Sequence, residues 1–294
     1  MSGRVLVFGA GGQLGRALLR RCREPNHVVG LARADADICK SQEVRRALRA
    51  HRPHFVVNCA AYTAVDLAET ERELAFAVNE DGARILAEES AAADAALIHI
   101  STDYVFDGRA DRPYGEDAPA NPLNVYGESK LAGEAAIQRK AGQHLIIRTG
   151  WLFGPSGRNF ATAILRQVMD GTPLAVVDDQ TGTPTYVDDL ALALTAAMRT
   201  LQTSVFGSWG TYHFAGSDVV SWYQFACMIR DQADPKRTTP KPRRTNTSEF
   251  TRPAPRPRYS ALDSSRFRRT FGIPPRALGD AISECIATHS CLQK

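Results

Sequence analysis

The sequence predicts an α/β protein whose first half forms a doubly wound parallel sheet and whose second half adds a smaller α/β lobe. In the first half, five short apolar runs rich in β-branched residues alternate with helical stretches, a pattern typical of parallel strands joined by helical crossovers. A glycine-rich turn follows the first run directly. The predicted strands are residues 4–8, 27–31, 54–58, 96–100 and 144–147.

The segments between these runs predict the crossover helices. They carry apolar residues at a 3.6-residue period or are rich in Ala, Leu, Glu and Arg, which favour helices. The predicted helices are residues 13–23, 41–50, 71–93 and 126–140.

Beyond about residue 148 the alternation becomes irregular. Helices are predicted at 159–169, 187–200 and 221–231, among short strands and a loop rich in Pro and Arg. We therefore expect a first domain over residues 1–148 and a second lobe over residues 149–294, some segments of which pack back on the first domain.

The composition is that of a globular protein rather than a disordered, fibrous or membrane one. The 294 residues are 44% hydrophobic and 23% charged, which is enough apolar material for a large core. The six cysteines form no C-x-x-C pair and fit reduced thiols. Because neither a signal peptide nor a membrane-spanning run is visible, we predict a cytoplasmic location and no membrane partner.

Three glycines, Gly9, Gly12 and Gly15, recur between the first strand and the first helix. Glycine permits a tight turn and lets the backbone approach a pyrophosphate, whose charge the N–H groups and the helix dipole then stabilise. Such turns also occur for packing reasons alone. The position of this turn at the start of a β-α-β unit favours a Rossmann-type dinucleotide site.

The end of the second strand bears on which dinucleotide binds. NAD-dependent proteins usually place Asp or Glu there to bind the ribose 2′-hydroxyl, whereas this chain has Arg33. Arginine suits a 2′-phosphate and so favours NADPH, with NADH as a possible second cofactor; the alternative is that Arg33 is simply a solvated loop residue. Asp37 and Ile38, further along the loop, are candidates to cover the adenine.

The third strand leads into a patch of small residues that includes Ala61, Tyr62 and Thr63. Either a flat cofactor lies against this backbone or a helix packs closely on it. The next residues, 64–69, are predicted to run from a loop into a helix, with Asp66 and Glu69 near its start, where the helix dipole favours acids.

The strongest local signal for chemistry is the pair Tyr126 and Lys130, four residues apart on one helix face. A nearby ammonium is expected to stabilise the phenolate and to lower the tyrosine pKa, which makes the phenol a better acid-base group. Thr102 lies just past the fourth strand, at the sheet edge where α/β sites form, and is predicted to hydrogen-bond a carbonyl that is being reduced.

Five motifs in order resemble the extended short-chain dehydrogenase/reductase superfamily, and within it the dTDP-4-dehydrorhamnose reductases. The resemblance covers nearly the whole chain. The motifs are STDYVFDG at 101–108, PLNVYGESK at 122–130, RTGW at 148–151, DQTGTPT at 179–185 and RPAPRP at 252–257.

The resemblance implies roles for individual residues. Gly12, Gln13 and Leu14 would bind the pyrophosphate of NADPH, Asp37 and Ile38 would cover its adenine, and Ala61, Tyr62 and Thr63 would line it. Thr102, Tyr126 and Lys130 would be the catalytic set, the last two also contacting the cofactor. Asp103 and Trp151 would contact the sugar, although a core aromatic is the alternative for Trp151. The first domain would thus bind NADP(H), and the second lobe mainly the substrate.

The implied reaction is the last step of dTDP-L-rhamnose biosynthesis. Hydride goes from the nicotinamide to C4 of dTDP-4-dehydro-β-L-rhamnose (dTDP-4-dehydro-6-deoxy-L-mannose) while Tyr126 supplies the proton. Lys130 would hold the nicotinamide ribose and tune Tyr126, and Thr102 would stabilise the developing charge on the oxygen.

At three positions this chain differs from the motifs of related proteins, and each difference narrows the function that we expect. Nucleotide-sugar 4,6-dehydratases carry Thr-Asp-Glu where this chain has Tyr104 after Asp103, so dehydration is not expected. Some members dimerise through Mg bound by glutamates that begin on the first helix, but this chain has Ala17 there, so no metal is expected and the protein is a monomer or a homodimer. Gly150 replaces the usual serine, a smaller side chain that is expected to alter substrate fit slightly.

Residues 236–258 are strongly basic, with eight Lys or Arg and one acid, Glu249. This gives the segment a charge of +7 and the remainder −3, within a net charge of +4. The segment is a solvated loop, a nucleic-acid patch or a wall of the nucleotide-sugar site. Its interleaved prolines and few aromatics do not suit base stacking, so no nucleic acid is expected. Arg256, in the family motif, is predicted to approach the substrate diphosphate.

Two alternatives to this function stay open. One is a regulatory subunit that keeps the fold and the cofactor without turnover, like the methionine adenosyltransferase β subunit, which resembles this family. The other is a reductase of a different dTDP-4-keto-6-deoxyhexose, because one or two pocket side chains decide which sugar and which face of the ketone are accepted.

Overall fold

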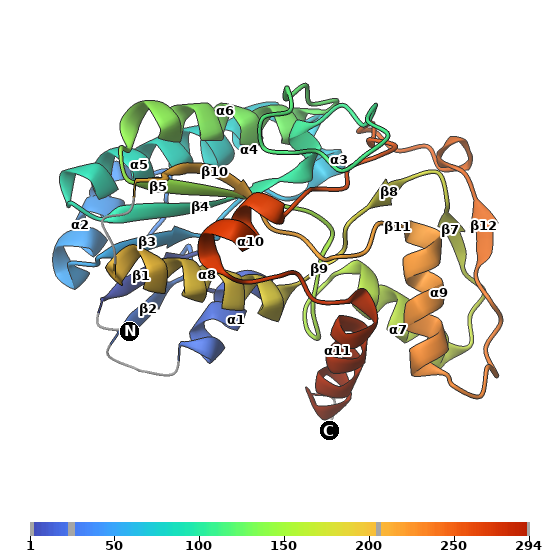
Figure 1. The fold of residues 1–294 in the computed structure, drawn as a ribbon. Helices are drawn as coiled ribbons and strands as arrows, with labels where there is room; N and C mark the ends of the chain where they lie inside the picture. Colours follow the sequence, from blue (N-terminus) through green and yellow to red (C-terminus); the bar gives the residue numbers. More distant parts are fainter. Residues whose placement is uncertain (1–2, 23–26, 204–206, 293–294) are drawn as a thin grey trace.

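The computed structural model describes residues 3–22, 27–203 and 207–292. Six strands form a parallel sheet in the order β10-β5-β4-β3-β1-β2, which fills the left half of Figure 1. The strands are β1 Val5–Phe8, β2 Val28–Leu31, β3 Phe55–Asn58, β4 Ala96–Thr102, β5 His144–Thr149 and β10 Gly210–His213. The strand order reverses between β1 and β3, the point at which sheets of this kind bind ligands beyond the carboxyl ends of their strands.

Helices cover both faces of this sheet, as the doubly wound prediction requires. The helices α1 Gln13–Arg21 and α8 Val187–Thr203 pack together on one face, and α2 Ser41–His51, α5 Gly82–Ala92 and α6 Val125–Lys140 cover the other. Alternate residues of β1 point to opposite faces. Val5 and Val7 therefore join the core with α1 and α8, while Leu6 and Phe8 join the core with α2 and α5.

The predicted helix at 71–93 is not a single regular α-helix. It begins as α4 Arg72–Phe76, continues as a π-helical turn over Ala77–Asp81 and ends as α5. The buried Asn79 in this turn accepts a hydrogen bond from the Tyr62 backbone N–H and donates to the Ser129 hydroxyl. These tertiary contacts favour the wider π-helical turn, and no local sequence pattern predicts them. The predicted end of the first helix at Arg23 lies outside the described residues.

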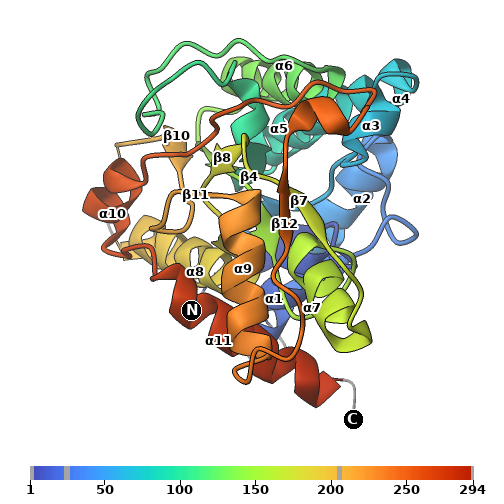
Figure 2. The ribbon, with the colours of Figure 1, turned by 90° about the vertical axis from the view of Figure 1, so that its right-hand side faces the viewer.

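The second half of the chain contributes to both parts of the fold. Its strand β10 extends the main sheet beside β5, and α10 Ser265–Phe271 packs on β10 and α8. The remaining elements stand at the right of Figure 1 and face the viewer in Figure 2. They are α7 Phe160–Asp170, α9 Trp222–Ala233, α11 Leu278–Leu292 and the strand pairs β6 Leu152–Phe153 with β9 Thr185–Tyr186, β8 Thr181–Gly182 with β11 Val220–Ser221, and β7 Ala175–Val177 with β12 Arg243–Thr245.

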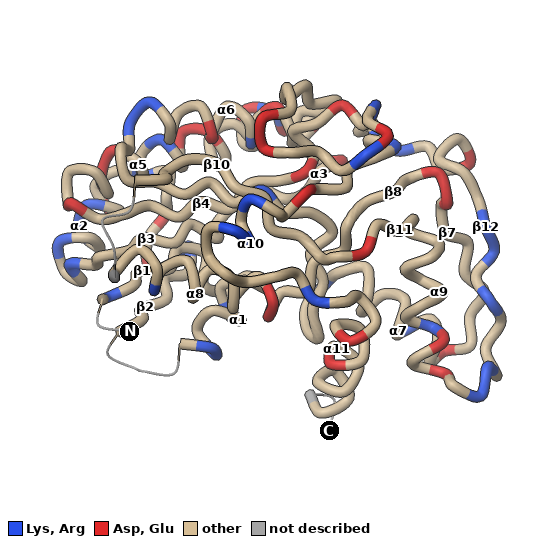
Figure 3. Tube along the Cα trace, in the orientation of Figure 1, with Lys and Arg blue, Asp and Glu red and all other residues tan. Residues whose placement is uncertain are grey.

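The basic segment is more ordered than the predicted loop. Part of it forms β12, which pairs in parallel with β7, and Figure 3 shows its blue residues along the outer edge of the second lobe. The Arg244 guanidinium lies 4.7 Å from the centre of the Tyr223 ring, which helps to fix this edge. Within the described ranges, no helix is both long enough and apolar enough to span a membrane.

Candidate active site

A pocket opens at the carboxyl ends of the central strands, between the start of α1 and the start of α6. We call it the first pocket. Most of the predicted site residues line it, namely Gly12, Gln13, Leu14, Ala61, Thr63, Thr102, Asp103, Tyr126, Lys130 and Trp151. The other predicted residues do not, namely Gly9, Gly15, Arg33, Asp37, Ile38, Tyr62 and Arg256.

The glycine turn fits the diphosphate of a dinucleotide. Gly9 has φ +77° and a Cβ there would lie 2.5 Å from the Ala60 backbone nitrogen, while a Cβ on Gly15 would lie 2.5 Å from the Gly9 carbonyl oxygen. Packing therefore requires both glycines. Gly11 faces open space, and the first turn of α1 holds no acid, so its N–H groups are available to an anion.

Two cations that the sequence did not single out also line the first pocket. Arg16 follows the glycine turn on α1, and Arg158 reaches the pocket from the loop before α7. Both suit the negative charge of a phosphate-bearing cofactor. For Arg16 the position one residue after the motif was a usable signal, whereas Arg158 is distant in sequence.

Four residues predicted to bind the cofactor lie outside this pocket: Arg33 at its 2′-phosphate, Asp37 and Ile38 at its adenine, and Tyr62 along it. The Arg33 side chain is 76% exposed and pairs with Asp37 at 3.3 Å. Ile38 is buried, and a Cβ on Gly82 would lie 2.7 Å from its side chain. The Tyr62 hydroxyl donates to Glu71 at 2.7 Å. The contacts of these four predicted residues with a cofactor therefore stay predictions.

Thr102 and Tyr126 meet at the floor of the first pocket. The Thr102 hydroxyl donates to a carboxylate oxygen of Asp103 at 3.1 Å, accepts from the Tyr104 backbone N–H at 3.2 Å and also contacts the Tyr126 phenol. Desolvation raises the pKa of Tyr126 to about 12, although the Thr102 contact opposes the shift. The predicted lowering of the Tyr126 pKa by Lys130 is therefore wrong, and the phenol keeps its proton at neutral pH.

Lys130 lines the first pocket, and its ammonium contacts the central strand β4. Its ammonium nitrogen donates to the Ile100 carbonyl oxygen at 2.6 Å and lies 3.1 Å from His99 Nε2. Burial lowers the pKa of Lys130 to about 8, although the charge of Glu134 opposes the shift. A lysine with this pKa is still mostly charged at neutral pH and close to losing its proton.

His99 is a neighbour of Lys130 that the sequence did not point to. The Asn58 Oδ1 accepts from the Ala60 N–H at 3.0 Å, so the Asn58 Nδ2 donates to His99 Nδ1 at 3.0 Å. A neutral His99 then carries its proton on Nε2, facing Lys130. A charged Lys130 would place its own N–H donors against the N–H donor of His99. This contact and burial therefore both disfavour the charged form of Lys130. The only sign of this role in the sequence was that His99 is a polar residue in an otherwise apolar strand.

A buried ion pair lies beside the same strands. Arg148 and Glu134 approach to 2.6 Å, and the Ser101 hydroxyl donates to the same carboxylate at 2.5 Å. Arg148 begins the RTGW motif, so the motif was recognisable, but its partner on α6 was not. The pair ties β4, β5 and α6 together behind the catalytic set.

Asp103 is held against Gly150. Its carboxylate is buried, and burial raises its pKa to about 6, although hydrogen bonds from Ser260 and Thr102 oppose the shift. A Cβ on Gly150 would lie 2.6 Å from the Asp103 carboxyl carbon. The absence of a side chain at Gly150 therefore leaves room for the Asp103 carboxylate. This gives the expected effect of Gly150 on substrate fit a physical basis.

Trp151 separates the first pocket from a second one. It has φ +49°, an unusual value for a non-glycine residue, and its ring stacks on Trp222 with centres 3.5 Å apart. A Cβ on Gly182 would lie 2.5 Å from the indole, so the DQTGTPT motif leaves room for this tryptophan. Trp151 lines the first pocket and Trp222 lines the second.

The second pocket lies in the smaller lobe. Its walls combine aromatic and aliphatic side chains with the two guanidinium groups of Arg252 and Arg256. Tyr104 also lines it, and the Tyr104 ring packs edge-on against Tyr126, with centres 6.0 Å apart. Two aromatic pairs thus stand between the pockets. In the described part of the chain, no group of three or more His, Cys, Asp or Glu is placed to hold a metal ion.

Comparisons with known proteins give the context of this site. The family model for the RmlD substrate binding domain matches residues 3–291. The chain is 42% identical over 285 residues to a dTDP-4-dehydrorhamnose reductase of Streptomyces griseus, covering 96% of this chain and 92% of the relative.

Two further matches bear on cofactor and substrate. A dTDP-4-dehydrorhamnose reductase of Bacillus anthracis, solved in complex with NADP, is 34% identical, with a TM-score of 0.88 over 98% of this chain and 100% of that one. A probable dTDP-4,6-dihydroxy-2-methyloxan-3-one 4-ketoreductase of Streptomyces antibioticus is 40% identical, covering 96% of this chain and 94% of the relative.

Proposed function

The chain belongs to the RmlD substrate binding domain family, and from this premise we propose that it is an NADPH-dependent reductase of dTDP-4-dehydrorhamnose. The reaction reduces the C4 ketone of dTDP-4-dehydro-β-L-rhamnose to the alcohol of dTDP-β-L-rhamnose. The observation that carries the proposal is the meeting of Thr102, Tyr126 and Lys130 in a pocket that begins at the glycine turn.

The cofactor fits the first pocket by charge and shape. When bound, NADPH supplies the hydride. The acid-free start of α1 and the open face of Gly11 would hold its diphosphate, and Arg16 would add a cation. The solved Bacillus anthracis relative in complex with NADP supports this choice.

The protein's own contribution is the proton and the position of the ketone. Tyr126 keeps its proton at neutral pH and donates it to the C4 oxygen as the C–O double bond becomes single. Thr102 hydrogen-bonds the same oxygen while charge develops on it. The Lys130 ammonium then stabilises the phenolate that remains until Tyr126 is protonated again.

The second pocket is the proposed site for the nucleotide part of the substrate. Its aromatic walls suit a base and a deoxyribose, and its two arginines suit a diphosphate. The sugar then extends past Trp151 and Asp103 toward Tyr126. This division gives the smaller lobe, within residues 149–294, most of the nucleotide contacts, and residues 1–148 the cofactor.

Reduction of a different dTDP-linked 4-keto sugar is the alternative function that a relative supports. The Streptomyces antibioticus relative is 40% identical and is named for a different 4-keto sugar. In this chain, the same proton donor and cofactor would serve either reaction, so the sugar that the pocket accepts decides between them. The identity of the product therefore has to be measured.

The test supplies purified protein with NADPH and enzymatically generated dTDP-4-dehydrorhamnose, follows NADPH absorbance and identifies the product by NMR. Steady turnover to dTDP-L-rhamnose is expected. Turnover only with another keto sugar would favour the alternative. NADPH binding without turnover of either sugar would favour a regulatory subunit.

We further propose a cytoplasmic protein that is a monomer or a homodimer and needs no metal to assemble. The six cysteines are all unpaired, which suits a reducing compartment. Sedimentation with and without Mg²⁺ checks the assembly, and a dimer that forms only with the metal would contradict it.

A further inference from the structure

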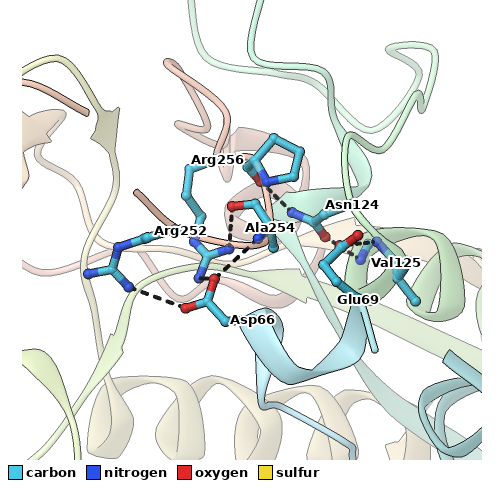
Figure 4. Close-up of polar contacts among 9 residues, drawn as sticks. Asp66, Glu69, Asn124, Val125, Arg252, Ala254 and Arg256 are labelled. Atoms are coloured by element: carbon cyan, nitrogen blue, oxygen red, sulfur yellow. Dashed lines mark hydrogen bonds and ion pairs between the residues drawn. The ribbon is translucent and has the colours of Figure 1, made fainter. Parts of the chain in front are cut away.

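Asp66 lies at the centre of a set of contacts that hold the segment 252–257, which we call the arginine segment. Its carboxylate pairs with Arg256 at 3.0 Å and with Arg252 at 3.4 Å, and it accepts a longer hydrogen bond, 3.4 Å, from the Ala254 backbone N–H (Figure 4). Asp66 is on α3 Val65–Ala68, in the first half of the chain. One carboxylate therefore fixes two guanidinium groups that come from a segment without regular structure.

The arginine segment is also tied to the helix that carries the catalytic pair. The Asn124 side chain donates to the Pro255 carbonyl oxygen at 2.8 Å and accepts from the Gly127 backbone N–H at 2.8 Å, which caps α6. Glu69 accepts from the Val125 N–H at 3.0 Å (Figure 4). The two acids of the 64–69 motif thus serve tertiary contacts rather than only the dipole of their own short helix.

These contacts decide where Arg256 points. Its side chain is only 9% exposed, its second guanidinium nitrogen donates to the Ala254 carbonyl oxygen at 3.1 Å, and it lies 5.8 Å from the centre of the Tyr104 ring. Tyr104 in turn packs edge-on against Tyr126. The guanidinium is therefore held on the wall of the second pocket, next to the aromatic pair that leads to the proton donor.

We propose that Asp66 is a positioning residue for substrate binding: it holds Arg256 and Arg252 in the orientation that receives the substrate diphosphate. This rests on the proposed function, in which the second pocket binds the nucleotide. An arginine that is already oriented loses less side-chain freedom when an anion binds. The single negative charge of Asp66 also offsets the mutual repulsion of the two guanidiniums and leaves a net positive wall.

The test measures binding of dTDP by calorimetry, a readout that needs no turnover. Asp66→Asn keeps the shape of the side chain and removes its charge. We expect about tenfold weaker dTDP binding and a raised KM for the sugar nucleotide, with the NADPH Kd and kcat unchanged. Asp66→Glu, which keeps the charge, should recover part of the loss.

A double variant shows whether Asp66 acts through Arg256. Arg256→Ala should weaken dTDP binding on its own, and adding Asp66→Asn should weaken it by less than tenfold further, because one of the two arginines that Asp66 positions is gone. Glu88→Gln is the matched control, since Glu88 is a half-exposed carboxylate that also contacts two cations, Arg84 and Lys140, far from both pockets. It should leave dTDP and NADPH binding unchanged.

The outcomes separate the two proposals. Failure of the wild-type protein to bind dTDP would reject the proposed function and, with it, the role of Asp66. Wild-type binding that Asp66→Asn leaves unchanged would reject the role of Asp66 alone. Tighter binding by Asp66→Asn would also reject it, because it would show that Asp66 competes with the diphosphate for the arginines.

Discussion

The two pockets differ in what holds their functional side chains. In the first pocket, Thr102 ends a strand of the main sheet, and Tyr126 and Lys130 stand on the helix α6. In the second, Arg252 and Arg256 belong to a segment without helix or strand that is held by polar contacts from Asp66 and Asn124. One set is placed by backbone hydrogen bonds and core packing, the other by a few polar and charged side chains.

This contrast predicts that substitutions in the two pockets change different kinetic constants. Changes to Thr102, Tyr126 and Lys130 in the first pocket should act on the rate of the chemical step, because these groups serve the reacting atoms in the proposed reaction. Changes around the second should act on affinity, because its groups contact a part of the substrate that does not react.

Lys130→Met should reduce kcat by about 10²- to 10⁴-fold, since it removes the charge that stabilises the Tyr126 phenolate. The same change should stabilise the fold at neutral pH, because it removes a buried ammonium whose pKa burial lowers to about 8. Thermal unfolding and steady-state rates check both effects. Lys140→Met, on the surface end of α6, is the control, and equal losses of activity in the two variants would contradict the assignment.

Gly150→Ala should lower the unfolding free energy by about 1–3 kcal/mol and raise the KM for the sugar nucleotide, because the added methyl group displaces the buried Asp103 carboxylate. Gly142→Ala is the matched control, since its Cβ would face open space. Urea unfolding compares the two. Equal stability of both variants would show that Asp103 moves aside without cost.

The pH dependence should follow Lys130. Its pKa of about 8 predicts that kcat/KM falls as pH rises through 8, by about tenfold per unit, as the ammonium loses its proton. For stability the sign is opposite: the pKa in the folded state lies below that of an unfolded lysine, so this group makes unfolding harder as pH rises above 8. Steady-state rates and melting temperatures measured across this pH range check both trends. Lys130→Met should not show the increase in stability above pH 8.

Arg33→Ala should change cofactor preference only modestly, by about three- to tenfold in favour of NADH, because its side chain is exposed and an exposed ion pair contributes little. Kd values for NADPH and NADH measure the shift. An unchanged ratio would leave Arg33 as a solvated partner of Asp37.

The same contrast explains how much the sequence predicted. The strands and the positions of Thr102, Tyr126 and Lys130 follow from local periodicity and from motifs fixed to regular elements, so the first pocket was largely predictable. The central sheet confirmed the predicted fold class. The π-helical turn at Asn79 and the paired strand β12 were not predicted, because each depends on contacts with residues far along the chain.

The second pocket was predictable only in part. The basic charge of residues 236–258 was visible, and Arg256 stood out in its motif. Its partner Asp66 is 190 positions earlier, and no local pattern links an acid of one loop to an arginine of another. In the same way, the rise in the Tyr126 pKa depends on burial in the fold, which no local pattern shows, and the predicted lowering of this pKa by Lys130 was therefore wrong.

The most direct test of the central claim is the rate of NADPH oxidation in a single turnover, at saturating dTDP-4-dehydrorhamnose, for Tyr126→Phe, with Tyr212→Phe as a control that loses a buried hydroxyl contact with the Ser208 carbonyl outside both pockets. We predict a loss of about 10²- to 10⁴-fold for Tyr126→Phe with dTDP affinity unchanged, and a normal rate for the control. A near-normal rate for Tyr126→Phe would contradict its role as the proton donor.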